Sequence, residues 1–458
     1  MNTNAKKAVM TSGSISRCMV SFAIPVFLGN LFQQLYNVVD SLVVGNFLGK
    51  DELAAVSSSG SLIFLLVGFL NGIFVGAGVV ISRYFGARQK KDIHDAVHTT
   101  IAFGIAAGLV LSIVGVIITP VLLRLMGTPD AVIDNSILYF RVYFCGVFAM
   151  TMYNVGNGIY QAVGDGRHPL YYLICSSVTN VILDLLFVAV LGFGIGSAAF
   201  ATVIAQFVAA SLAFRRLTKI NDDYRVNFKE IKFYPGKLSE ILKMGLPTGV
   251  QNSIIAFANV IVQSNINAFG ESAVAGCGIY AKIEGFAFLP ITSFSMALTT
   301  FIGQNLGAKQ HERAKKGAYF GIAAGVIIAE LIGVITWFLI PYFARAFNKD
   351  AAVISYSVLQ ARTMSLFYCL LAFTHCIAGI LRGAGKTQIP MYVMLLCWCI
   401  LRITYITIAV KLFPVIRTIF WAYPITWSLS SIVFLIYFLK ADWLHAYDKS
   451  PMKKYKSE

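Results

Sequence analysis

The sequence predicts an all-α membrane protein with twelve transmembrane helices, arranged as two six-helix lobes related by a pseudo-two-fold axis along the membrane normal. Three observations predict this fold. Of the 458 residues 57% are hydrophobic and only 13% are charged, and the mean hydropathy is +0.73. The apolar residues gather in segments of membrane-spanning length, and the two halves of the chain resemble each other. A soluble domain does not need so much apolar surface.

Twelve apolar segments reach the length of about 20 residues that a helix needs to cross a bilayer. They cover approximately residues 15–46, 53–82, 95–120, 131–160, 169–192, 196–217, 238–268, 273–303, 314–341, 352–380, 390–412 and 418–440. Each segment is predicted to form one helix. Several exceed the minimum length, which permits tilt without fixing an angle.

The basic residues are distributed unevenly across the predicted membrane. The two tails and the loops on the same side carry 27 of the 37 Lys and Arg, and the opposite loops carry six. The other four lie within helices: Arg141, Lys282, Arg362 and Arg402. Because loops rich in Lys and Arg face the cytoplasm, we expect both termini to be cytoplasmic. The net charge of +16 then reflects orientation and lipid headgroups, and we expect no nucleic-acid partner.

The pattern of recurring segments indicates that the two halves of the chain arose by duplication. Four segments recur about 221 residues later: Pro25–Asn30 as Pro247–Asn252, Leu48–Gly49 as Phe269–Gly270, Phe85–Arg88 as Leu306–Lys309, and Gly164–Pro169 as Gly383–Pro390, the last with two residues inserted. Each half holds six helices, an even number, so both halves begin on the same side of the membrane. Repeated halves of this kind enclose a midplane cavity in many secondary transporters.

The duplication also sets the predicted domain boundaries. They are an N-terminal lobe over residues 1–218, a basic cytoplasmic linker over 219–237, a C-terminal lobe over 238–440 and a basic cytoplasmic tail over 441–458. The start of the chain is expected to be a cytoplasmic tail and not a removed signal peptide, because no short apolar core with a small-residue cleavage site follows it.

Two carboxylates lie inside long apolar runs, Asp40 within 35–49 and Asp184 within 179–190. Holding an ionised carboxylate in hydrocarbon costs about 3 kcal/mol on insertion scales. A membrane helix therefore rarely carries one without a partner or a function. The alternative is that Asp184 only hydrogen-bonds within the bundle.

Polar side chains surround both acids. Gln33, Tyr36, Asn37 and Asp40 form one helical stripe, and Ser176, Asn180 and Asp184 share a helix face at spacings of four. Thr202, Tyr139 and Asn157 add oxygen atoms on two further helices, and Pro25 interrupts the first helix, where a missing amide bond permits a kink. We predict a cation-coupling or proton-coupling site at Asp40, Asn180, Asp184 and Thr202, with Gln33, Tyr36, Asn37, Tyr139 and Asn157 in a substrate cavity. Oxygen ligands suit sodium, which makes these four residues candidate sodium ligands, and two carboxylates can also share a proton; the residues do not choose between the two.

The repeat makes this cluster asymmetric. The positions equivalent to Asp40 and Asp184 carry Ile261 or Val262 and Tyr405, so the acids are not needed to build the scaffold. The second lobe has its own charges in apolar segments: Lys282, Glu284 and Glu330. A Lys282–Glu330 ion pair is the simpler interpretation, and a second, substrate-facing charge site is the alternative.

Several motifs together resemble those of the multidrug and toxic compound extrusion (MATE) transporters, from about residue 15 to 440. They are Tyr36-Asn37-x-x-Asp40 followed by Val44-Gly45, Gly303–Ala308 after the eighth helix, and Gly164–Pro169 and Arg382–Thr387 after the fourth and tenth helices. The resemblance is closest to the DinF-like branch, whose first-lobe motif matches Asp40, Asn180, Asp184 and Thr202. The seventh-helix acid of the NorM-like branch is not matched, since Gln251 stands in that region.

The resemblance implies a non-enzymatic antiporter in the inner cell membrane of a bacterium or archaeon. It would export amphipathic, often cationic or aromatic drugs or toxins in exchange for protons or sodium ions, with no cofactor other than that ion. We expect a monomer in the lipid bilayer. A lipid-linked oligosaccharide or lipid flippase of the same superfamily is the alternative, for which Lys282, Arg141 and Arg402 would contact the pyrophosphate.

Other classes fit less well. Gly383–Thr387 resembles the end of a phosphate-binding loop, but the position that requires glycine is Ile380, so we expect no ATP binding. An intramembrane aspartyl protease would need Gly-x-Gly-Asp, whereas Asp184 follows Val-Ile-Leu. The loop over 83–91 lacks the set pattern of Gly and paired Arg of major-facilitator transporters.

Overall fold

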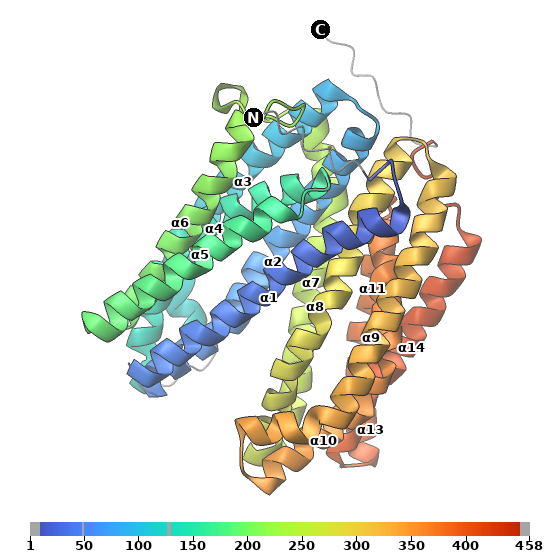
Figure 1. The fold of residues 1–458 in the computed structure, drawn as a ribbon. Helices are drawn as coiled ribbons and strands as arrows, with labels where there is room; N and C mark the ends of the chain where they lie inside the picture. Colours follow the sequence, from blue (N-terminus) through green and yellow to red (C-terminus); the bar gives the residue numbers. More distant parts are fainter. Residues whose placement is uncertain (1–9, 48–49, 126–129, 449–458) are drawn as a thin grey trace. The chain divides into compact units, whose positions relative to one another are not determined.

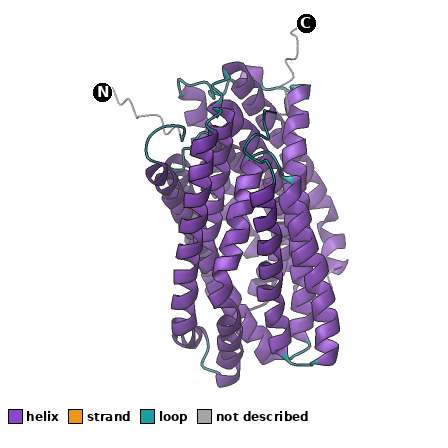
Figure 2. Cartoon of the chain, turned by 90° about the vertical axis from the view of Figure 1, so that its right-hand side faces the viewer, coloured by secondary structure: helices purple, strands orange, loops and turns teal. Residues whose placement is uncertain are grey.

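The computed structural model describes residues 10–47, 50–125 and 130–448. These residues are almost entirely helical, and Figure 2 shows helices joined by short loops. Twelve helical spans are long and apolar enough to cross a membrane. The predicted all-α membrane fold is confirmed. Leu48–Gly49 of the repeat and the lysines at 449–456 of the tail lie outside the described residues.

Each of the twelve spans overlaps one predicted segment. Figure 1 shows the helices that form the spans. The first six are formed by α1 (Ile15–Phe47), α2 (Lys50–Gly86), α3 (Lys90–Leu125), α4 (Asp130–Ala162), α5 (Arg167–Asp184) continued by the π-helix η1 (Leu185–Val190), and α6 (Ile195–Lys219). The short 3-10 helix η2 (Phe228–Glu230) lies in the linker. The last six are formed by α7 (Pro235–Asn267), α8 (Glu271–Gly307), α9 (His311–Phe347), α10 (Ala351–Met364) with η3 (Ser365–Phe367) and α11 (Tyr368–Gly383), α12 (Gln388–Met394) with η4 (Leu395–Leu401) and α13 (Arg402–Leu412), and α14 (Ile416–Lys440).

The duplication reappears in the turns that end the helices. Arg88 after α2 has a φ of +55°, and Lys309 after α8, 221 residues later, has a φ of +57°. Non-glycine residues rarely adopt this left-handed conformation. In both turns the amide of the following residue bonds back to a carbonyl in the last helical turn. Two such turns at one repeat spacing indicate that both halves share the same backbone plan.

The turns after α4 and α11 correct one detail of the predicted repeat. Gly164 and Gly385 have positive φ values of +88° and +75°, and they lie 221 residues apart, as do Pro169 and Pro390. The predicted pairing of Gly164 with Gly383, with a two-residue insertion, is therefore wrong. Gly164 corresponds to Gly385, and no insertion is needed.

Asp165 in the first of these turns organises the start of α5. Its carboxylate accepts hydrogen bonds from the amides of Arg167 and His168 at 3.1 and 3.2 Å and from His168 Nδ1 at 2.5 Å. Burial alone would raise the pKa of Asp165, but the bonds from the His168 ring and from the two amides outweigh it and hold the pKa below its ordinary value.

Asp165→Asn is expected to reduce stability by about 1–2 kcal/mol at pH 7, because the charged acceptor is lost. A carboxylate with a lowered folded-state pKa stabilises the fold above its unfolded-state pKa of about 3.9, and this contribution is lost as the pH falls through the folded-state value. Thermal unfolding in detergent at pH 7, 5 and 3 should show the difference from wild type disappearing at low pH. The exposed Asp134 offers a control variant, Asp134→Asn, and a difference independent of pH would contradict this account.

The chain divides into two compact units. The N-unit comprises Ile24–Phe85 and Gln89–Gly249, and the C-unit comprises the described residues up to Ala23, Gly86–Arg88 and those from Val250 onward. These units differ from the predicted lobes in two places. The start of α1 belongs to the C-unit, and the linker and the first half of α7 belong to the N-unit.

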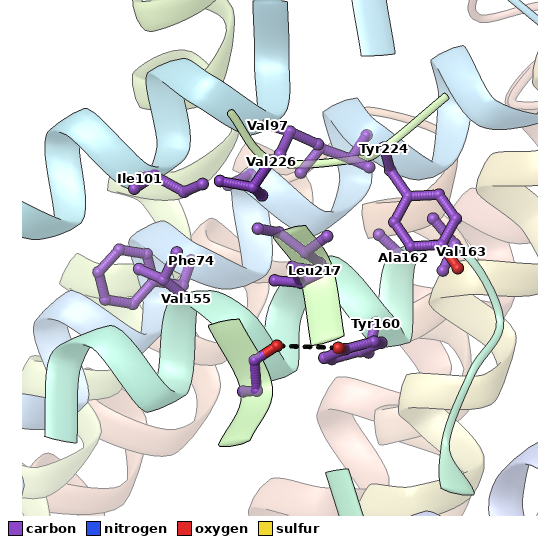
Figure 3. Packing of buried hydrophobic residues seen from close by; sticks show 14 of the residues in the cluster. Phe74, Val97, Ile101, Val155, Tyr160, Ala162, Val163, Leu217, Tyr224 and Val226 are labelled. Carbon is purple, nitrogen blue, oxygen red and sulfur yellow. Dashed lines mark hydrogen bonds between the residues drawn. The ribbon is translucent and has the colours of Figure 1, made fainter. Parts of the chain in front are cut away.

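The core of the N-unit is one large cluster of buried side chains from α2, α3, α4, α5, α6 and the linker. Figure 3 shows part of it, with Phe74, Val97 and Val155 on three different helices and Tyr224 and Val226 from the linker. Tyr160 is fully buried and donates a hydrogen bond to the carbonyl of Ala213 at 3.0 Å. The predicted linker is thus packed against its own lobe.

Small residues let α2 and α7 approach closely within the N-unit. Gly72 and Gly76 on α2 stand four residues apart, and so do Gly245 and Gly249 on α7. A Cβ on Gly72 would collide with the backbone of Gly249, and a Cβ on Gly76 with the backbone of Gly245. This is the small-xxx-small contact by which membrane helices pack backbone to backbone.

The C-unit is built around α8, α9 and α11, which contact one another, and α14 packs against α11. The residues before α1 dock on its edge: the Arg313 guanidinium donates to the carbonyls of Met10, Ser12 and Gly13. Asn305 also donates to Met10 O at 3.2 Å. The first turn of the described chain is therefore fixed to the start of α9.

Candidate functional site

The polar stripe of α1 borders a cavity of about 610 Å³ inside the N-unit. This volume falls in the range of about 300–1,000 Å³ that is usual for small-molecule sites. All five predicted cavity residues line it, together with Asp40 and Thr202: Gln33, Tyr36, Asn37, Tyr139 and Asn157. The structure thus brings side chains from α1, α4 and α6 to one space.

The cavity has further polar and aromatic walls that the sequence analysis did not name. They are Asn30, Asn71, Tyr143, Met150, Tyr153, Asn154 and Gln206. Asn30 extends the α1 stripe by one turn, and Tyr143 follows Tyr139 at a spacing of four, with the two rings stacked at 6.4 Å. Helical spacing from the residues already predicted was the signal that could have found these two.

Asp184 lies behind the cavity and not on its wall. Its side chain is 1% exposed and that of Asn180 is fully buried, and neither lines the cavity. Asp40 borders the cavity, and its carboxyl group interacts directly with that of Asp184. Two carboxyl groups in contact must hold a proton or a cation between them to avoid repulsion.

Thr202 connects the cavity to the buried acid. Its hydroxyl donates to Ala198 O at 3.2 Å, so the Tyr36 hydroxyl, at 3.2 Å from Thr202 Oγ1, is the donor in that pair. Tyr36 in turn lines the cavity beside Asp40. A change in the protonation or cation binding of the two carboxyl groups can therefore alter the position of Tyr36, which a bound molecule would contact.

Asn180 bridges Asp184 and Thr202. Its amide nitrogen donates to Asp184 Oδ2 at 2.7 Å, and its amide oxygen accepts from Thr202 N at 3.2 Å. The opposite orientation of the amide would set two acceptors against each other at Asp184 and two donors at Thr202. A donated hydrogen bond of this kind suits an ionised Asp184.

Local helix geometry also changes at this site. The π-helix η1 begins at Leu185, directly after Asp184. Such turns in membrane and soluble helices are frequent at functional sites. Pro25, predicted as a kink, lies inside α1, which continues unbroken through it.

The second-lobe charges do not form the ion pair considered above. The Lys282 ammonium lies over the Phe347 ring at 5.9 Å, and Glu330 accepts a hydrogen bond from the Cys369 amide at 3.1 Å. Glu284 accepts from the Tyr280 hydroxyl at 3.4 Å. Among the described residues these three charged groups therefore have separate partners.

A family model described as MatE matches residues 25–186 and again residues 247–408. The chain belongs to the MatE family. Both repeats of the duplication are thus covered by the same family model. MATE proteins are membrane transporters and not enzymes, so this chain is a multi-pass transporter of a cell membrane.

The MATE relatives include a probable multidrug resistance protein, YoeA, of Bacillus subtilis (strain 168). It is 30% identical over 387 residues, which cover 82% of this chain and 83% of that protein. A FAD transporter of Shewanella oneidensis is 25% identical over 360 residues, covering 76% and 77%.

A solved structure of a multidrug resistance MATE family transporter in an outward-facing conformation superposes with a TM-score of 0.89. It is 24% identical and covers 98% of this chain and 100% of that one. The likeness shows the shared fold of two six-helix lobes. The solved MATE structures are of single chains, which is consistent with a monomer.

Proposed function

We propose that this protein is a secondary-active antiporter that exports amphipathic, cationic or aromatic small molecules in exchange for protons or sodium ions. The observation that carries the proposal is the cavity with Asp40 on its wall and Asp184 in contact behind it. One cation or proton at this pair and one molecule in the cavity would compete for the same negative charge. Competition of this kind couples the two movements in opposite directions.

The cavity wall favours cationic or neutral cargo. Asp40 is the one Asp, Glu, Lys, Arg or His among the described residues that line it. Four tyrosines offer aromatic faces, on which cations and flat rings bind well. A pyrophosphate-linked lipid would need basic partners, and no lining residue supplies one in the described part of the chain. The cavity therefore supports the drug exporter over the flippase.

Sodium and protons remain the two candidate coupling ions. Asn180 donates its amide nitrogen to Asp184 Oδ2, which suits the ionised acid, and a proton or a sodium ion can then bind at the pair of carboxyl groups. Asp40, Asn180, Asp184 and Thr202 can supply the oxygen ligands that a sodium ion prefers. One charge moving across 100 mV contributes about 2.3 kcal/mol to the coupling, and the concentration gradient adds to it.

We place the protein in the DinF-like branch, with both termini cytoplasmic. The branch assignment is supported by the four polar residues of the N-unit and by the absence of an acid at the equivalent place in α7. There Gln251 is buried and donates to Met394 Sδ at 2.9 Å. The orientation rests on the excess of Lys and Arg in the loops of one side.

Efflux of a fluorescent cationic dye from proteoliposomes tests the proposal. A sodium gradient and a proton gradient are imposed separately, with flavin adenine dinucleotide as a second cargo because one relative is named a FAD transporter. Dye efflux driven by one gradient supports the antiporter and identifies the ion. If neither gradient moves dye but an anionic cargo is moved, the cationic-cargo proposal fails.

Thr202→Val is expected to slow gradient-driven efflux about 3- to 10-fold. The substitution keeps the shape of the side chain but removes the hydroxyl that bonds Tyr36, and one such bond contributes about 0.5–1.5 kcal/mol. The dependence of efflux rate on ion concentration is the measurement. Thr202→Ser retains the hydroxyl and is expected to stay within about twofold of wild type; equal loss in both variants would show that packing, not the hydroxyl, matters.

A further inference from the structure

The segment after α14 folds back onto the C-unit. Trp443 stacks on Phe438 of α14 at 5.3 Å, and the Tyr447 hydroxyl donates to Gly383 O at 2.7 Å. His311, the first residue of α9, hydrogen-bonds through Nδ1 to Leu444 O at 3.0 Å. Residues 441–448 are therefore held against the start of α9 and the end of α11.

This fold-back brings two histidines and one carboxylate together. One ligand atom each of His311, His445 and Asp448 lie within 4.8 Å of one another. His311 Nε2 and Asp448 Oδ2 are 3.5 Å apart, and the two imidazole rings are centred 4.7 Å apart. Two ligands at about 2 Å from a tetrahedral ion stand about 3.3 Å apart, so the His311–Asp448 spacing already fits.

Hydrogen bonds to Nδ1 of both histidines place the lone pair of each ring on Nε2, the nitrogen that would bind a metal ion. His311 Nδ1 faces the carbonyl of Leu444, an acceptor, so that nitrogen carries the proton and Nε2 carries the lone pair. His445 Nδ1 lies 2.7 Å from Asp442 Oδ1, which fixes its proton in the same way. A histidine held through its other nitrogen by a carbonyl or carboxylate is the usual arrangement at zinc sites.

The chain contains a second cluster of similar composition that lacks this feature. His94, His98 and Glu230 also lie close together. Both nitrogens of His98 are already used, Nδ1 by the carbonyl of His94 at 2.8 Å and Nε2 as acceptor from Asn227 N at 3.0 Å. That cluster holds the linker on α3 and has no free imidazole lone pair on His98. It provides a built-in comparison.

We propose that His311, His445 and Asp448 form a binding site for one divalent transition-metal ion of the zinc type. Imidazole nitrogen and carboxylate oxygen are ligands that such ions accept, with water completing the coordination. The three side chains are partly exposed, at 26%, 51% and 40%, so an ion can reach them from solvent. Bound metal would join the segment after α14 to the start of α9.

Zinc titration of the full-length protein tests the site. The protein is purified in detergent through a tag without histidine, stripped with EDTA and titrated with ZnCl₂ by calorimetry. We expect one ion per chain and a higher melting temperature with Zn²⁺, and neither effect with Mg²⁺, which prefers oxygen ligands. Absence of stoichiometric Zn²⁺ binding would overturn the proposal.

Variants separate this site from the other histidines. His311→Gln and His445→Gln should each weaken Zn²⁺ binding at least tenfold. Asp442 positions His445 without binding the ion, and Asp442→Asn should weaken Zn²⁺ binding by no more than about 100-fold. His94→Gln in the comparison cluster should leave binding unchanged. If His445→Gln binds Zn²⁺ like wild type, or if His94→Gln removes the binding, the proposed ligands are wrong. His445 is half-exposed, so its variant is expected to fold, and the unchanged elution profile in gel filtration checks this.

Discussion

Asp40→Asn is expected to reduce gradient-driven export at least tenfold while the protein still folds and inserts. Asparagine keeps the size of the side chain at the cavity wall but cannot exchange a proton or carry a negative charge opposite Asp184. Without that charge, neither the coupling ion nor a cationic molecule binds one conformational state of the transporter more tightly than the other. The measurement is dye efflux from proteoliposomes under the imposed gradient that drives the wild type.

Glu284→Gln is the matched control for this experiment. Glu284 is also an acid within a helical span, but it belongs to the C-unit and hydrogen-bonds Tyr280. The proposal places coupling in the N-unit, so this variant should keep its gradient dependence. The reverse result, with normal export in Asp40→Asn and none in Glu284→Gln, would move the coupling site to the second lobe.

Asp184→Asn should separate coupling from cargo binding. Asp184 does not border the cavity, so binding of the dye to the purified protein is expected to remain close to wild type while gradient-driven export is lost. Asp40→Asn, at the wall, should weaken both. Equal effects of the two variants on dye binding would show that the buried acid acts through the cavity charge alone.

The apolar segments and the repeat predicted the fold well because both depend on local sequence. Membrane helices must satisfy their own backbone, so segment length and composition determine where they lie. The polar stripe on α1 was predictable for the same reason, since Gln33, Tyr36 and Asp40 share a face at helical spacing. Their position on one cavity follows from that stripe, because the polar face of α1 lines the cavity.

Direct contacts between distant helices were not predictable. The sequence analysis placed Asp40 and Asp184 in one coupling site, but their direct interaction follows only from the packing of α1 against η1 and α6. The predicted Lys282–Glu330 ion pair is wrong for the same reason, because the presence of opposite charges in one lobe does not determine which helix faces meet. The docking of the linker onto α3 through His98 also had no signal in the composition of that linker.

The α2–α7 contact is a packing feature on which the N-unit depends strongly. Gly72 and Gly76 face the backbone of Gly249 and Gly245 with no room for a Cβ. Alanine normally stabilises a helix relative to glycine by about 0.5–1 kcal/mol. At these two positions the collision should outweigh that gain, because neither backbone can move aside without separating the helices.

Gly76→Ala is therefore expected to destabilise the protein by about 1–3 kcal/mol, the usual range for overpacking, and Gly76→Val by more. Gly68→Ala is the control, because it lies two turns earlier on the same helix and its added Cβ would meet no atom within 4 Å. That variant should match or exceed wild type in melting temperature, measured in detergent. The opposite signs of two glycine-to-alanine changes on one helix would show that close packing, not helix propensity, sets the effect. If Gly76→Ala were as stable as Gly68→Ala, the two helices would have to stand farther apart than the structure places them, and α7 would not be anchored to the N-unit through its glycines.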